Sequence, residues 1–147
     1  MMNFSYEYPR AMNTVDAIII DSETQSKILL INRLNEPYQN CWALPGGFIE
    51  MDETLLDSVN RETLEETSLS GIDFKQFKTY GDPGRDPRGR NITVVFCGFC
   101  DDTDKAAAGD DAKSLQWFNL NNLPELGFDH RKIIEDFIED IVILGKR

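Results

Sequence analysis

Three glutamates in the segment Arg61–Glu66 have the residue type and the spacing to bind a metal ion together. At about 100° per residue along a helix, Glu62, Glu65 and Glu66 fall within an arc of roughly 100°, so their carboxylates can converge on one point. Such crowding costs a helix about 0.2–0.5 kcal/mol for each like-charged pair. Carboxylate oxygens are the hard ligands that Mg²⁺ and Mn²⁺ prefer. The spacing therefore predicts a divalent-cation site, with Mg²⁺ or Mn²⁺ as cofactor.

Two further residues belong with these glutamates. Arg61 precedes Glu65 by four residues, where it can hold that carboxylate by a charge-assisted hydrogen bond. Glu53 is distant from Glu62 along the chain, yet a Gly-rich stretch leading into the helix can bring it to the same place. An exposed acidic helix face with ordinary salt bridges is the alternative, and it is the usual explanation of a charge run.

The order of residues in this segment resembles the signature of the Nudix hydrolases. Gly47, five residues, Glu53 and seven more residues are followed by "RETLEETSL", which begins at Arg61. Thr63 stands where the family usually has a bulky aliphatic residue, and Ser68 stands where it usually has glycine. Thr63 is a packing position, and Ser68 lies where the helix must end, so neither change removes a metal ligand.

The resemblance implies an α/β fold, the Nudix-type α/β/α sandwich with a mixed sheet between helices. It also implies hydrolysis of a nucleoside diphosphate linked to another moiety. The residues that it marks as catalytic are Glu53, Arg61, Glu62, Glu65 and Glu66. The metal would be bound by Glu62, Glu65, Glu66 and Gly46, and substrate by Gly47, in a glycine loop that lets backbone approach metal and phosphate.

Four more segments resemble bacterial ADP-ribose pyrophosphatases and related Nudix domains: "WALPGGFIE", "GDPGRDPRGR", "LQWFNLNNLP" and "LGFDHRKII". This likeness implies cleavage of ADP-ribose to AMP and ribose 5-phosphate. Two alternatives stay open. One is a pyrophosphohydrolase that removes noncanonical (d)NTPs, and the other is a domain that senses ADP-ribose without hydrolysing it. The intact acids of the signature favour an enzyme.

Arginines and aromatic residues outside the signature are candidates for substrate binding. Arg85, Arg88 and Arg90 lie in a turn-rich loop where guanidinium groups could meet phosphate or ribose. An ordinary surface turn explains them equally well. Single aromatic side chains more often belong to the core, but some could stack on adenine. These candidates are Phe4, Tyr8, Trp42 and Tyr80.

The general base is not fixed by the sequence. A glutamate of the signature or an acid from the polar loop 101–113 could serve, with Asp110 and Asp111 as the loop candidates. His130, the single histidine, is expected to be structural rather than catalytic. Cys97 and Cys100 form a weak zinc half-site without a second pair, and we interpret both as ordinary thiols.

Short apolar and β-branched runs predict the strands that must carry these residues. Expected strands are Val15–Ile20 and Lys27–Arg33 as a hairpin, Cys41–Phe48 broken by a loop at Pro45-Gly46-Gly47, Phe74–Tyr80, Asn91–Phe99 and Ser114–Leu120. Two amphipathic helices are expected, one from Glu53 or Thr54 to Ser68 with Asp52 as N-cap, and one over Asp129–Leu144. The loop 101–113 is predicted to be mobile. Together these elements indicate a mixed sheet covered by helices.

Composition limits the remaining classes. A chain of 147 residues fits one domain, residues 1–147, and a net charge of −11 disfavours a nucleic-acid partner. The sequence lacks a basic tract that would bind an anionic membrane surface. It also lacks an apolar run of the roughly 18 residues needed to span a membrane. The opening segment "MMNFSYEYPRAMN" does not have the pattern of a signal peptide. Three cysteines favour a reduced cytoplasm. The expected partner is a small-molecule substrate, with a homodimer left open.

Overall fold

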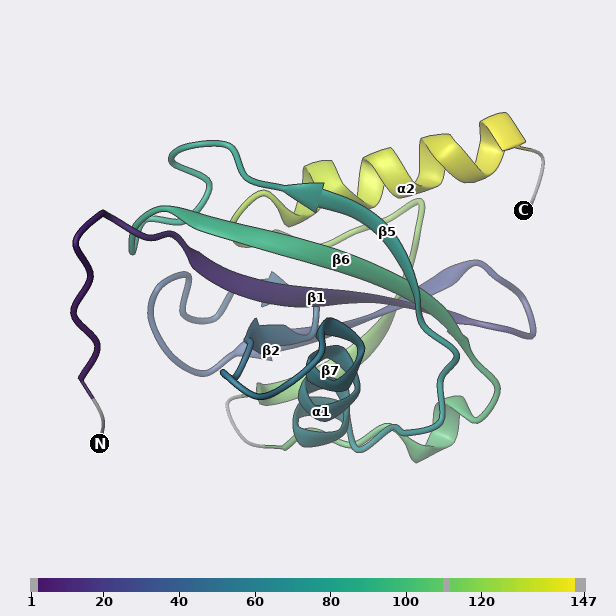
Figure 1. Ribbon diagram of the computed structural model, residues 1–147. Helices are drawn as coiled ribbons and strands as arrows, with labels where there is room; N and C mark the ends of the chain where they lie inside the picture. Colours follow the sequence, from purple (N-terminus) through teal and green to yellow (C-terminus); the bar gives the residue numbers. More distant parts are fainter. Residues whose placement is uncertain (1–2, 110–111, 145–147) are drawn as a thin grey trace.

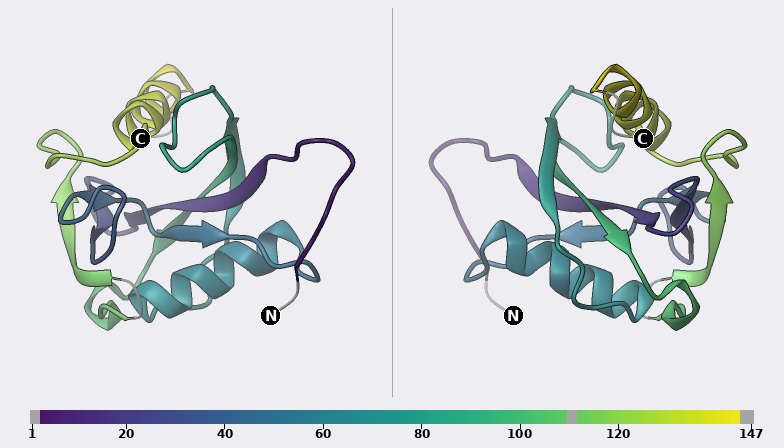
Figure 2. Two further views of the ribbon diagram at one scale, coloured as in Figure 1. Left: turned by 90° about the vertical axis from the view of Figure 1, so that its left-hand side faces the viewer. Right: turned by 90° about the vertical axis from the view of Figure 1, so that its right-hand side faces the viewer.

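A mixed β-sheet lies between two helices, α1 (Leu55–Thr67) and α2 (His130–Leu144), which cover its opposite sides (Figures 1 and 2). The computed structural model describes residues 3–109 and 112–144. The predicted layer arrangement, helix on sheet on helix, is confirmed. Within the described residues, neither helix combines the length and the hydrophobicity needed to cross a membrane.

The sheet contains seven strands in the order β3-β2-β1-β6-β5, with β4 paired to β1 and β7 paired to β2. Strand β1 runs parallel to β6, and the other pairings are antiparallel. The predicted strands are all present, with bounds shifted by a few residues at most. Their bounds are β1 Met12–Asp21, β2 Lys27–Arg33, β3 Trp42–Ala43, β4 Gly46–Phe48, β5 Lys75–Tyr80, β6 Asn91–Cys100 and β7 Ala112–Asn119.

Strand β1 explains why both sides of the sheet are buried. Successive side chains of a strand point to opposite faces, so a continuous apolar run must be covered twice. Ile18 and Ile20 belong to the core that contains Ile133 of α2. Ile19 belongs to the core that contains Val59 of α1. The two helices are therefore held by opposite faces of one strand.

Helix α1, which carries the glutamates, begins with a reciprocal cap. The hydroxyl of Thr54 accepts a hydrogen bond from the Asp57 N–H at 3.0 Å, and the Asp57 carboxylate accepts one from the Thr54 N–H at 3.3 Å. This capping box satisfies two backbone donors that the helix leaves free. The prediction of Asp52 as N-cap is therefore wrong, because Thr54 and Asp57 form the matched pair.

The other end of α1 is closed by a distant part of the chain. Ser68 adopts the left-handed conformation, with φ of 66°, and its hydroxyl donates to the Ala107 carbonyl at 2.9 Å. The Ala107 N–H donates to the Thr67 carbonyl at 2.8 Å, and the Gly109 N–H donates to the Glu66 carbonyl at 3.2 Å. The loop 101–113 was expected to be mobile. Its described part contains a short 3₁₀ helix and is hydrogen-bonded to the helix end, and its mobility stays a prediction.

Gly46 and Gly47 lie in strand β4 rather than in a loop, which corrects the prediction made from the Pro-Gly-Gly sequence. Gly47 pairs with Val15, and Gly46 pairs with Asp16. A side chain on Gly46 would collide with the Val15 carbonyl and the Asp16 carboxylate. Gly46 is therefore explained by the close approach of β4 to β1, which leaves no room for a side chain, and not by a turn.

Candidate active site

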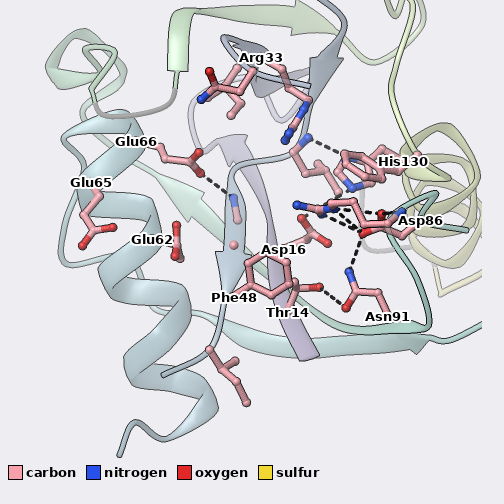
Figure 3. Close-up of a pocket in the computed structure, with 18 of the residues that line it drawn as sticks. Thr14, Asp16, Arg33, Phe48, Glu62, Glu65, Glu66, Asp86, Asn91 and His130 are labelled. Atoms are coloured by element: carbon pink, nitrogen blue, oxygen red, sulfur yellow. Dashed lines mark hydrogen bonds and ion pairs between the residues drawn. The ribbon is translucent and has the colours of Figure 1, made fainter. Parts of the chain in front are cut away.

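One cleft of about 490 Å³ gathers the predicted residues from three separate parts of the chain (Figure 3). Helix α1 forms one wall, strand β4 crosses the middle, and the loop between β5 and β6 forms the other wall together with the start of α2. The predicted residues that line the cleft are Gly46, Gly47, Arg61, Glu62, Glu65, Glu66, Arg85 and Arg88. Its volume falls within the usual range for a small-molecule site.

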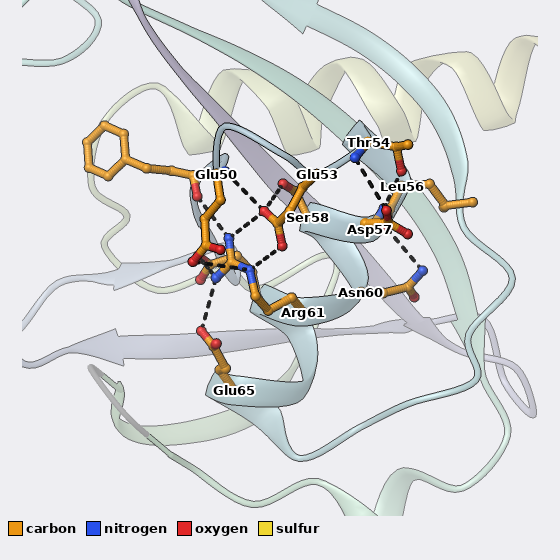
Figure 4. A network of polar contacts seen from close by, with 11 residues as sticks. Glu50, Glu53, Thr54, Leu56, Asp57, Ser58, Asn60, Arg61 and Glu65 are labelled. Carbon is orange, nitrogen blue, oxygen red and sulfur yellow. Dashed lines mark hydrogen bonds and ion pairs between the residues drawn. The ribbon is translucent and has the colours of Figure 1, made fainter. Parts of the chain in front are cut away.

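Arg61 organises the carboxylates of the helix wall (Figure 4). Its Nε atom lies 2.5 Å from Glu53, and Nη1 lies 2.9 Å from Glu62 and 3.2 Å from Glu65. Glu50 is the fourth carboxylate within reach, at 3.8 Å. The expected pairing of Arg61 with Glu65 is thus present. One guanidinium serves four carboxylates, so the wall keeps an excess of negative charge.

Glu53 reaches the site through Arg61 and does not itself line the cleft. Hydrogen bonds from Arg61, and then from the Ser58 hydroxyl, lower the pKa of Glu53 to about 2. The hydrogen bond to Glu53 in turn raises the pKa of Arg61 above its ordinary value. Glu53 therefore fixes Arg61, and Arg61 fixes the glutamates that face the cleft.

Glu62 and Glu66 are held by the two glycines of β4. A side chain on Gly47 would place its Cβ 2.5 Å from the Glu62 carboxylate, so glycine lets this acid sit against the strand. Burial raises the pKa of Glu62 even though Arg61 donates a hydrogen bond to it. The Gly46 N–H donates to Glu66 at 2.7 Å, and Glu66 is buried. These contacts show why the segment Gly46–Gly47 and the helix belong to one site.

The donor set of this wall fits a divalent cation. Its carboxylate oxygens are hard ligands. The Arg61 guanidinium is shared by four carboxylates, and Glu62 is partly buried, so a bound cation would neutralise excess negative charge. Among the residues described, no three acidic, histidine or cysteine side chains are already arranged around one point as an ion would require. The predicted ligands are close neighbours, and in this arrangement Arg61 occupies two of them.

The opposite wall contains arginines that are already paired. Arg85 makes two hydrogen bonds to Asp129, at 2.6 and 2.9 Å, and its side chain is only 3% exposed. The sequence leaves open whether this arginine meets substrate or lies in an ordinary surface turn, and the contact that it makes is with Asp129. Arg88 binds the buried Asp86 and remains 36% exposed. Arg90 is exposed and is not among the described residues that line the cleft.

Sequence reasoning missed Asp16, which lies at the floor of the cleft. Its Oδ2 atom accepts a hydrogen bond from the Thr93 hydroxyl at 2.6 Å, and its Oδ1 atom lies 3.6 Å from His130 Nε2. Burial raises the pKa of Asp16 to about 7, against the hydrogen bond from Thr93. The available signal was a lone carboxylate inside the apolar run "VDAIII".

His130 is buried and forms a hydrogen bond with the backbone, as expected of a structural histidine. Its Nδ1 atom accepts a hydrogen bond from the Leu44 N–H at 3.0 Å, and burial lowers its pKa to about 3. The histidine also lines the cleft. Asp86, Asn91, Phe48 and Phe128 are further lining residues that the motifs did not indicate.

Two remaining predictions concern the loop aspartates and a pair of cysteines. Asp110 and Asp111, the loop candidates for the general base, lie outside the described residues. Cys97 and Cys100 are free thiols, and burial raises the pKa of each. Their interpretation as ordinary thiols stays a prediction.

Comparisons with known proteins point to one family. Residues 11–137 match the family model described as NUDIX domain. The chain is 49% identical over 125 residues to an ADP-ribose pyrophosphatase of Methanocaldococcus jannaschii, covering 84% of this chain and 71% of that protein. It is 33% identical to the ADPR responsive transcriptional repressor NtrR of Acinetobacter baylyi, covering 88% of this chain and about half, 54%, of the repressor.

A solved structure agrees with these matches. The NUDIX domain of Shewanella oneidensis NrtR, crystallised with ADP ribose, superimposes with a TM-score of 0.84 and 30% identity. The superposition covers 95% of this chain and 94% of that domain. The relatives thus include a protein described as a pyrophosphatase and one described as a transcriptional repressor.

Proposed function

The chain belongs to the Nudix family, and from this premise we propose that it hydrolyses ADP-ribose to AMP and ribose 5-phosphate with Mg²⁺ or Mn²⁺ as cofactor. Water adds to one phosphorus of the pyrophosphate and loses a proton, while the bond from that phosphorus to the bridging oxygen breaks. Each product keeps one phosphate. We also propose that residues 1–147 act as a single Nudix domain.

The observation that carries this proposal is the placement of the helix-wall carboxylates and Arg88 on facing walls of one cleft. The carboxylates can hold a divalent cation that neutralises a pyrophosphate, and the guanidinium on the facing wall can bind the rest of the nucleotide. The 49% identity to an ADP-ribose pyrophosphatase supports ADP-ribose as the particular substrate.

Each carboxylate has a proposed role that follows from its contacts. Glu62, Glu65 and Glu66, with the Gly46 backbone, would hold the divalent cation, which supplies neutralisation of phosphate oxygens and a more acidic water. Arg61 orients Glu62 and Glu65, and Glu53 holds Arg61 in place. Loss of Glu53 would therefore act on the site through Arg61.

The proposal also includes candidates for the general base and for the residues that bind substrate. The general base is a glutamate of α1 or one of Asp110 and Asp111. Gly109, which immediately precedes these aspartates, donates a hydrogen bond to the backbone of Glu66, which supports the loop candidates. Arg88 is the arginine that we propose binds substrate, and Gly47 lets backbone approach the phosphates. Arg85 would act through its pairing with Asp129.

A substrate panel tests this proposal against its rivals. Purified protein with Mg²⁺ or Mn²⁺ is given ADP-ribose, NADH, sugar nucleotides, diadenosine polyphosphates and NTPs, and products are identified by chromatography. The highest kcat/KM is expected for ADP-ribose, with AMP and ribose 5-phosphate in equal amounts. Preference for an NTP would replace the proposal with nucleotide cleanup. Tight binding of ADP-ribose without turnover would replace it with a sensor, the activity suggested by the relative described as ADPR responsive.

A further inference from the structure

Aromatic side chains line the cleft at a place that the motifs did not mark. Phe4, Tyr8, Trp42 and Tyr80 all lie in the described part of the chain, and none of them lines the cleft. The lining aromatic residues are Phe48, at the end of β4, and Phe128, just before α2. Phe48 is 42% exposed, so its ring is accessible to a ligand in the cleft.

Phe48 lies close to the carboxylates because of its position in strand β4. It directly follows Gly46 and Gly47, which contact Glu66 and Glu62. Its own carbonyl accepts a hydrogen bond from Arg61 Nη2 at 3.0 Å. A strand advances about 3.3 Å per residue, so the ring lies within one nucleotide's reach of a pyrophosphate held at the helix wall.

Arg88 lies against this ring from the opposite wall. Its guanidinium carbon is 4.9 Å from the centre of the Phe48 ring and 5.6 Å from the centre of the Phe128 ring. Guanidinium planes and aromatic rings both stack well on flat π-systems. Arg88 also lines a second, shallow hollow with Pro37, Tyr38 and Pro87, so the cleft stays open beyond it.

Asp86 fixes where Arg88 points. The Asp86 side chain is fully buried and accepts hydrogen bonds from Arg88 Nε, Arg88 Nη2, the Arg88 backbone N–H and Asn91 Nδ2. Burial alone would raise the pKa of Asp86, but these hydrogen bonds outweigh it and lower the pKa to about 2. A permanently charged, buried acid therefore holds the Arg88 guanidinium in one orientation.

We propose that Phe48 and Arg88 form the platform on which the nucleobase of the substrate stacks, and that Asp86 is the positioning residue for Arg88. The part of the substrate that the platform takes is the nucleobase, because a base offers a flat π-face and a ribose phosphate does not. The proposal rests on the proposed function only in taking the substrate to be a nucleoside diphosphate derivative. It assigns the base to this end of the cleft and leaves the sugar phosphate for the remainder.

Binding of the two separate products tests the platform. Isothermal titration with AMP and with ribose 5-phosphate, both in the presence of Mg²⁺, is compared between wild type and Phe48→Leu. Loss of a stacking ring is expected to weaken AMP binding by about five- to hundredfold and to change ribose 5-phosphate binding by less than about twofold. Phe48→Tyr keeps the ring and should restore AMP binding. Phe99→Leu is the matched control, because Phe99 is 47% exposed and lies outside the cleft.

Variants of the second wall test the positioning role. Arg88→Lys keeps the charge and loses the planar group, so it should weaken AMP more than ribose 5-phosphate. Asp86→Asn should reproduce that selective loss, and if it fails to fold, Arg88→Lys still decides. Equal weakening of both products, unchanged AMP binding in Phe48→Leu, or no AMP binding by wild type would each overturn the platform. Selective AMP loss in a protein that never turns over ADP-ribose would overturn the proposed function and keep the platform.

Discussion

The two walls of the cleft treat charge in opposite ways. On the α1 wall, the guanidinium of Arg61 is shared among Glu50, Glu53, Glu62 and Glu65. On the other wall, each arginine has its own acid, Arg85 with Asp129 and Arg88 with Asp86. The first wall is short of positive charge, and the second is balanced before any ligand arrives.

This difference separates carboxylates that gain from a cation from arginines whose charge is already compensated. An excess of carboxylates repels itself, so it gains from a cation that binds from solution. A buried acid–base pair gains nothing from a further ion and loses several kcal/mol if one partner is removed. Substitution of the acids on the first wall should therefore reduce activity, and substitution in the buried Arg85–Asp129 pair should reduce stability.

The largest expected effect comes from removing one negative charge from the α1 wall. Glu66→Gln keeps the volume and keeps an oxygen that can accept the Gly46 N–H. We expect kcat/KM to fall by about a thousandfold, roughly 4 kcal/mol, because a charged ligand is lost. Stability measured by denaturation in chelator should be unchanged or higher, since like-charge repulsion is relieved.

Glu135→Gln is the control for that variant, because it makes the same exchange at an exposed position on α2. Its activity should equal that of wild type, and excess chelator should abolish turnover in both proteins. Undiminished turnover by Glu66→Gln, or by wild type in chelator, would contradict the metal site.

The second test removes one member of a balanced pair. Arg85→Met keeps much of the volume and leaves the Asp129 carboxylate without its partner, so the free energy of unfolding should fall by about 3 kcal/mol. Urea denaturation measures this change. Arg90→Ala, on an exposed side chain of the same loop, should alter stability by less than about 0.5 kcal/mol. Equal stability losses in the two variants would show that the Arg85 pair has no special role.

The smallest effect is a change in how stability depends on pH, and it concerns the floor between the walls. With the pKa of His130 lowered from 6.5 to about 3, the unfolded chain binds more protons between those values, so stability rises with pH. With the pKa of Asp16 raised from 3.8 to about 7, the folded chain binds more protons, so stability falls with pH. Each slope is at most about 1.4 kcal/mol per pH unit, and in wild type the two oppose each other between about pH 4 and 6.

Single substitutions should separate these slopes. His130→Gln leaves the Asp16 trend, so stability should decrease from pH 4.5 to 6 relative to wild type. Asp16→Asn leaves the His130 trend, so stability should increase over the same range. Urea titrations at several pH values in chelator measure both. Parallel pH profiles for the two variants would contradict the assigned pKa shifts.

The sequence predicted what depends on near neighbours. The glutamates of α1 share one face because of helical spacing, and the hydrophobic runs of β1 and β6 define a buried sheet whatever surrounds them. Arg61 and Glu65 are four residues apart, so their contact could also be predicted. These features need only the local geometry of a helix or a strand.

The sequence could not predict pairings that the tertiary fold creates. Arg85 and Arg88 look equivalent along the chain, but Asp129 lies 44 residues from the first and Asp86 only two from the second. Gly46 reads as a turn residue until β1 lies beside it. The roles of these residues follow from contacts whose partners are distant in sequence or hidden by burial.

The fastening of loop 101–109 onto the end of α1 has a consequence for the order in which the protein folds. A chain that emerges from the ribosome delivers α1 long before Ala107, which lies 39 residues after Ser68. Until Ala107 and Gly109 arrive, the carbonyls of Thr67 and Glu66 lack these partners. We therefore expect the amides of Ala107 and Gly109 to gain hydrogen-exchange protection only when this loop docks on α1, after β6 has been synthesised. The last turn of the helix that carries the acids would then complete its hydrogen bonds only after β6 has emerged.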